Sequence, residues 1–194
     1  MRPRATSWRS PKLPLCSFEG ESSSGGAVSL DDPRVQAVQG WVQEVVVGLN
    51  LCPFAAGPLG RGKVGWRSVE VASDAVMGVL ALVEEVDSGA YETALLVLPD
   101  CRFSEFLDIA AAAQDMLEQT RLDQRFQLAS FHPDYCFEGA WKDDPANATN
   151  QSPYPALHVL RVEDVSRAVD SHPNIAGVPE RNMALLRDRA GWTE

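Results

Sequence analysis

Residues 93–98, T-A-L-L-V-L, form a continuous apolar run that ends at Pro99. A run of this length, stopped by a proline, is typical of a β-strand that is buried on both faces. A strand of this kind needs other elements packed on each side of its sheet. The run therefore favours a sheet covered by helices.

Helical and strand patterns alternate around this run. Apolar spacing and capping residues predict helices over residues 33–49, 75–89, 104–120 and 163–171 and from residue 178 onward, and further strands over residues 66–72, 126–131 and 156–162. The order α-β-α-β-α-β-β-α-α predicts an α/β (or α+β) fold with one small, mostly parallel four-stranded sheet and helices packed on it. An antiparallel fourth strand remains open. The carboxyl ends of three parallel strands would share one edge, where ligands bind in open α/β folds.

The length of 194 residues suits one globular domain, expected over residues 31–194. Residues 1–30 are rich in arginine, serine and proline and have no acid before Glu19, which is typical of either a disordered tail or an organelle transit peptide. No apolar run approaches the roughly 20 residues that span a bilayer, so a membrane protein is not expected. The net charge of −10 argues against nucleic-acid and membrane-surface partners.

The four cysteines have no C-x-x-C spacing, so neither a zinc ribbon nor a disulfide scaffold is predicted. This cysteine usage indicates a reducing compartment. We therefore expect an intracellular, cytoplasmic protein, unless residues 1–30 direct it into an organelle.

The most informative polar stretch is the long segment between the third and fourth strands. Loops of this length inside compact domains are usually binding loops, lids or disordered segments, and its aromatic residues argue against disorder. His132 follows the third strand, with Asp134 two residues later, and such a pair can act as a general base or bind a metal. The alternative is a strand end at which Asp134 accepts backbone hydrogen bonds in a turn.

His158 lies within the fourth strand, where it is either a core histidine or a second nitrogen for the site. Cys52 could be a nucleophile if a histidine lowered its pKa, although burial between Leu51 and Phe54 is the commoner outcome. Further polar groups are candidates for ligand contact or for satisfying nearby backbone groups: Asn147, Asn150, Tyr154, Arg161, Arg181 and Asn182.

Several blocks together carry a family resemblance. They are L-N-L-C-P-F-A at residues 49–55, S-F-H-P-D-Y at 130–135, S-P-Y-P-x-L-H-x-L-R at 152–161, and P-E-R-N at 179–182. The chain resembles an uncharacterised, mainly bacterial family, a domain of unknown function, over residues 31–192. The resemblance implies no activity, but it implies that Tyr135 belongs with the residues already named. It also implies that an arginine is usual where this chain has Gln151, which argues against an anion contact there.

Two functions remain open. The first is an enzyme acting on a small polar or anionic substrate, with catalytic His132, Asp134, Cys52 and His158. It would either use a divalent metal such as iron or zinc on His132, His158 and Asp134, or use Cys52 without a metal. The second is a non-catalytic module that binds a metabolite or a partner. A small-molecule ligand is expected in both, and the sequence does not indicate an oligomeric state.

Overall fold

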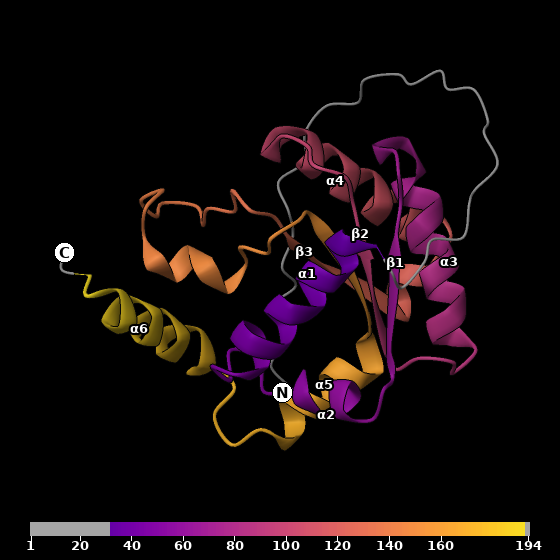
Figure 1. Cartoon of the computed structure of the whole chain (residues 1–194). Helices are drawn as coiled ribbons and strands as arrows, with labels where there is room; N and C mark the ends of the chain where they lie inside the picture. The colour runs from indigo at the N-terminus through magenta and orange to yellow at the C-terminus, as the bar shows by residue number, and fades with distance from the viewer. Residues whose placement is uncertain (1–31, 193–194) are drawn as a thin grey trace.

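The computed structural model describes residues 32–192 (Figure 1). The predicted tail over residues 1–30 lies outside this range. Helices and strands alternate as expected, with short 3₁₀ turns at Ala72–Asp74 (η2), Leu122–Gln124 (η3) and Pro145–Thr149 (η4). The elements are α1 (Pro33–Trp41), the π-helical turn η1 (Val42–Val47), α2 (Ala56–Gly60), β1 (Val64–Ser68), α3 (Ala75–Asp87), β2 (Thr93–Val97), α4 (Phe103–Gln119), β3 (Phe126–Phe131), β4 (Ala156–Arg161), α5 (Val162–Ser171) and α6 (Val178–Ala190).

The four strands form one sheet in the order β1-β2-β4-β3. Only β1 and β2 pair in parallel, whereas β4 pairs antiparallel with both β2 and β3. The expectation of a mostly parallel sheet is therefore wrong: the sheet is mixed. The reason is the connection after β3, which contains no crossover α-helix and returns the chain in the opposite direction, so that β4 inserts between β2 and β3. The alternative of an antiparallel fourth strand is confirmed.

Each face of the sheet has its own core. On one face, α3 and α4 pack against Ala94, Leu96, Leu157 and Val159. On the other face, α1 packs against Leu95 and Val97; we call this second cluster the α1-side core. All five residues of β2 are buried, as its apolar run predicts.

The start of α1 is attached to β1 by a polar network. Asp32 caps the helix by accepting the backbone N–H of Arg34, and it also accepts the Ser68 hydroxyl at 2.5 Å. The Arg34 guanidinium bonds to the Asp32 carboxylate and to the Val69 carbonyl. The hydrogen bonds from Arg34 hold the pKa of Asp32 well below its usual value. This network fixes the position of α1 on the sheet.

The end of the first helix differs from the expectation. The α-helical pattern stops at Trp41, and a π-helical turn follows over Val42–Val47, in which the Gly48 N–H donates to the Gln43 carbonyl five residues earlier. β1 lies two to four residues earlier than predicted.

Figure 1 shows α1 in front of the sheet, while α6 and the segment between β3 and β4 lie together to one side. Within the described residues, no helix combines the length and apolar character needed to cross a membrane.

Candidate functional site

His132 is the first residue after β3 and is 1% exposed. Its Nδ1 accepts the backbone N–H of Asp134 at 3.0 Å, so Nε2 carries the proton and donates to the Cys101 carbonyl, also at 3.0 Å. The rings of Phe103 and Phe106 flank the imidazole, with centroids 5.1 Å away. Nδ1 is thus used within the long loop, and Nε2 joins the loop to the segment just before α4. Asp134 itself is exposed.

His158 lies on β4 beside Leu95 of β2 and Ala129 of β3. Its Nε2 is 2.6 Å from the Thr93 hydroxyl. Because that hydroxyl donates its proton to the Val159 carbonyl at 2.7 Å, Nε2 of His158 must be the donor to Thr93. Burial lowers the pKa of His158 to about 4, so the ring is neutral at physiological pH.

The two histidines lie on opposite faces of the sheet. His132 packs against Phe106 of the core under α3 and α4, whereas His158 shares its face with Leu95 of the α1-side core. The structure therefore does not bring together the predicted metal ligands His132, His158 and Asp134. Among the residues that the structure describes, no group of three or more His, Cys, Asp or Glu side chains could hold a metal ion.

Cys52 lies in the turn after η1. Burial raises the pKa of its thiol, which keeps it protonated and weakly nucleophilic at neutral pH.

The polar residues of the long loop mainly bond to the loop itself. Asn147 is fully buried; its amide donates to the carbonyls of Trp141 and Lys142 and accepts the N–H of Phe137. The Asn150 carbonyl accepts the His132 N–H at 3.1 Å, and its side chain bonds to Tyr135, whose pKa is raised by burial. Trp141, in contrast, is 79% exposed. Asn147 and Asn150 therefore shape the loop.

α6 connects this loop to the end of η1. Arg181 donates to the carbonyls of Leu49 and Asn50, and Asn182 donates to that of Leu51 at 2.6 Å. One turn later, Arg187 forms a bidentate pair with the buried carboxylate of Asp144, whose pKa is lowered by these hydrogen bonds.

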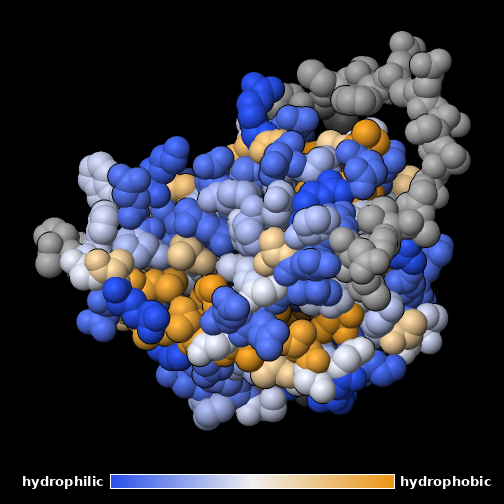
Figure 2. Space-filling model, in the orientation of Figure 1, coloured by the Kyte–Doolittle hydropathy of each residue, from blue (hydrophilic) through white to orange (hydrophobic). Residues whose placement is uncertain are grey.

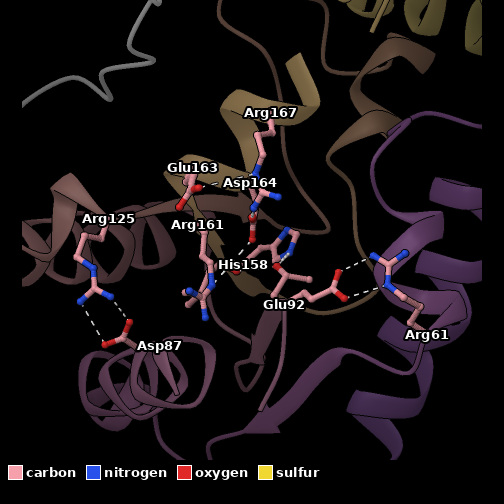
Figure 3. Close-up of polar contacts among 11 residues, drawn as sticks. Arg61, Asp87, Glu92, Arg125, His158, Arg161, Glu163, Asp164 and Arg167 are labelled. Carbon is pink, nitrogen blue, oxygen red and sulfur yellow. Dashed lines mark hydrogen bonds and ion pairs between the residues drawn. The ribbon is translucent and has the colours of Figure 1, made fainter. Parts of the chain in front are cut away.

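Figure 3 shows further ion pairs near the end of β4. The Arg161 guanidinium lies 3.9 Å from Asp164 at the start of α5, while Arg125 pairs with Asp87 and Arg61 with Glu92. Arg161 and Arg181, both predicted to bind substrate, therefore already have protein partners.

A groove of about 510 Å³ lies between the first helix and the long loop. One face of α1 and η1 contributes Ala37, Gly40, Trp41, Glu44 and Val45, and the loop contributes Pro133, Gln151, Ser152 and Pro153. Tyr154, next along the chain, packs on the α1-side core. None of the residues predicted for the site lines this groove, although His132, Asn150 and Tyr154 directly adjoin lining residues in the chain. The sequence did not reveal its helical wall.

Gly40 explains why the helical wall leaves room. A Cβ atom at this position would meet no atom within 4 Å, and the φ angle of Gly40 is not positive. Neither backbone conformation nor packing therefore requires glycine here, although a glycine inside a helix is destabilising. An isolated glycine in a helical pattern is the signal that sequence reasoning could have used.

In the rest of the helical wall, Trp41 is held by an aromatic contact. The Trp41 ring packs edge-on against Phe131, with centroids 5.2 Å apart and planes at 62°. Glu44 and Val45 lie on the π-helical turn, and π-helical turns occur frequently at functional sites. The surface around this side of the molecule is mostly hydrophilic, with apolar surface gathered lower down, between α6 and α5 (Figure 2).

A family model described as a protein of unknown function (DUF1415) matches residues 34–192. Neither the curated proteins nor the solved structures contain a match to this chain.

Proposed function

The chain belongs to the DUF1415 family of proteins of unknown function, and we propose that it is a non-catalytic module that binds a small molecule in the groove between α1–η1 and the long loop. The observation that carries this proposal is Gly40. Gly40 lines the groove and, having no side chain, keeps that part of it open at a cost to the helix, and functional sites are where local stability is given up. The groove is shallow and open to solvent, and its volume is that of a small-molecule site.

The state of the candidate catalytic groups supports binding over catalysis. A general base needs a free lone pair within reach of substrate, whereas both His132 nitrogens are engaged inside the protein. A thiol nucleophile needs a lowered pKa, whereas that of Cys52 is raised. The enzyme hypothesis, including a metal-assisted version, stays a prediction.

We also propose an intracellular location and a single domain over residues 31–194. The location is supported by Cys52, Cys101 and Cys136, which are free thiols.

The binding proposal is tested by screening the full chain against a metabolite library with ligand-observed NMR. Hits are then compared between wild type and Gly40→Leu, which fills the groove. Gly60→Leu is the matched control. Gly60 is on the helix α2, and a side chain added there would also enter open space, but Gly60 does not line the groove. We expect the hits to lose binding in Gly40→Leu and to keep it in Gly60→Leu. Equal binding by both variants would refute the groove as the site.

A further inference from the structure

The described residues that line the groove bring one negative charge and no positive charge. Among the described residues that line it, Glu44 is the only one with an ionisable side chain, and this carboxylate is exposed. Pro133 and Pro153 have no backbone N–H. An anionic ligand would therefore meet a like charge and no cationic partner from these residues.

The loop's two polar side chains are already engaged. Gln151 donates an amide N–H to the Tyr135 carbonyl at 2.9 Å, and Ser152 donates its hydroxyl to the Tyr154 carbonyl at 2.5 Å. The Ser152 donor is thus used, while Gln151 keeps its second amide N–H and its carbonyl oxygen. The loop wall can accordingly donate and accept one hydrogen bond through Gln151, and it adds no charge to the groove.

Trp41 adds an aromatic surface next to the carboxylate. Trp41 and Glu44 line the same groove, and the contact of Trp41 with Phe131 holds the ring in place. Ala37 and Gly40, the smallest residues of the helical wall, leave space beside the ring. A tryptophan face attracts cations through its quadrupole, in addition to packing on flat apolar groups.

From this arrangement we infer that the ligand is a small organic cation, an ammonium or guanidinium group attached to a flat apolar group. The cation would pair with Glu44, and the apolar group would lie against Trp41 between the two prolines. This inference rests on the proposed function and names the ligand class of the same groove.

Three probes with one ring and different charge test the inference: benzylammonium, benzyl alcohol and benzoate, each titrated at millimolar concentration. Binding is followed by ¹H–¹⁵N NMR of the full chain, with the Trp41 indole resonance assigned from Trp41→Phe. We expect benzylammonium to shift the resonances of Trp41 and of the groove backbone more strongly than the other two probes. In Glu44→Gln its affinity should fall about twofold to fivefold, because the substitution removes an ion pair in an exposed position and leaves the cation–π contact with Trp41.

Glu84→Gln is the control, since Glu84 is an exposed carboxylate on α3, across the sheet from α1. It should bind benzylammonium as wild type does. If benzyl alcohol or benzoate binds as well as benzylammonium, or if Glu44→Gln has no effect, the cation inference is overturned while the groove stands. If no probe shifts a groove resonance, the cation inference is overturned as well, and the proposed function is decided separately by the metabolite hits in Gly40→Leu.

Discussion

Replacing Gly40 by alanine should stabilise the protein. Gly40 lies within the continuous helical segment formed by α1 and η1, and its added Cβ would have no neighbour within 4 Å. The only effects left are the reduced backbone freedom of the unfolded chain and the better helix propensity of alanine.

The size of the effect follows from those two causes. Glycine in a helix interior is about 0.5–1 kcal/mol less favourable than alanine. For a domain of this size, 1 kcal/mol corresponds to a shift of about 2–4 °C in Tm. Gly40→Ala should therefore raise Tm by about 1–4 °C.

Gly48→Ala is the matched opposite case. Its Cβ would clash with the backbone carbonyl oxygen of Glu44, a contact that only a backbone shift can relieve. The same gain in propensity is then outweighed by overpacking, which costs about 1–3 kcal/mol. The two substitutions add the same methyl group, in open space at Gly40 inside α1 and against the backbone at Gly48, the C-cap of η1.

Urea unfolding followed by far-UV circular dichroism measures both variants, with the slope m checked against wild type so that a change in midpoint reports a change in stability. The reasoning is refuted if Gly40→Ala lowers the midpoint, since its Cβ would then not lie in open space. It is equally refuted if Gly48→Ala raises the midpoint.

Three further predictions concern polar groups. Asn147→Ala should lower the free energy of unfolding by about 1–3 kcal/mol, measured by urea, because the Lys142 carbonyl and the Phe137 N–H lose their partner, while the Trp141 carbonyl keeps the Asp144 N–H. The pKa of Asp144 is lowered in the folded state, so its carboxylate stabilises the fold above the pKa it has in the unfolded chain, and this stabilisation is lost as pH falls. In Asp144→Asn the free energy of unfolding should therefore change less with pH below about pH 5. His158 should stay neutral down to about pH 4 in an NMR titration. Because the unfolded chain takes up this proton at higher pH, the free energy of unfolding should decline as pH falls from about 6.5 towards 4. A titration midpoint of His158 above about pH 6 would contradict its burial.

Much of the secondary structure could be predicted because local patterns determine it. β3 occupies residues 126–131 as expected, and α6 begins at Val178, where a proline and an acid mark a helix start. The π-helical turn could not be predicted in the same way. The valines at positions 42, 45 and 46 have ordinary helical spacing, and the bond from Gly48 to Gln43 leaves no trace in that spacing.

The pairing of β4 illustrates a second limit. Its apolar alternation predicts a strand, but the pattern is the same for a parallel and an antiparallel neighbour. Its place between β2 and β3 depends on how the long loop returns the chain. Besides its internal hydrogen bonds, that loop is held by distant residues such as Arg187, which pairs with Asp144.

The sequence predicts the long loop as the place of the site, but it does not predict the residues that line the groove. Residue type marks Asn147 or Asn182 as polar, but it does not tell whether the amide meets a ligand or a backbone carbonyl. Asn182 meets the Leu51 carbonyl, 131 residues earlier in the chain, and such a partner follows only from the tertiary fold. The helical wall was missed for the opposite reason: Ala37 and Gly40 act by being small, and a search for reactive groups passes over them.

These positions separate the residues that support the walls of the groove from the residues that line it. His132 fixes the loop to the start of α4, Asn147 shapes the loop from within, and Asn182 ties α6 to the turn after η1. Each of them supports a wall of the groove without lining it, and a preorganised site depends on such support. His132→Ala should then weaken stability and ligand binding together, whereas Gly40→Leu should remove binding and leave the fold intact. A chain in which both substitutions acted only on stability would have no binding groove here.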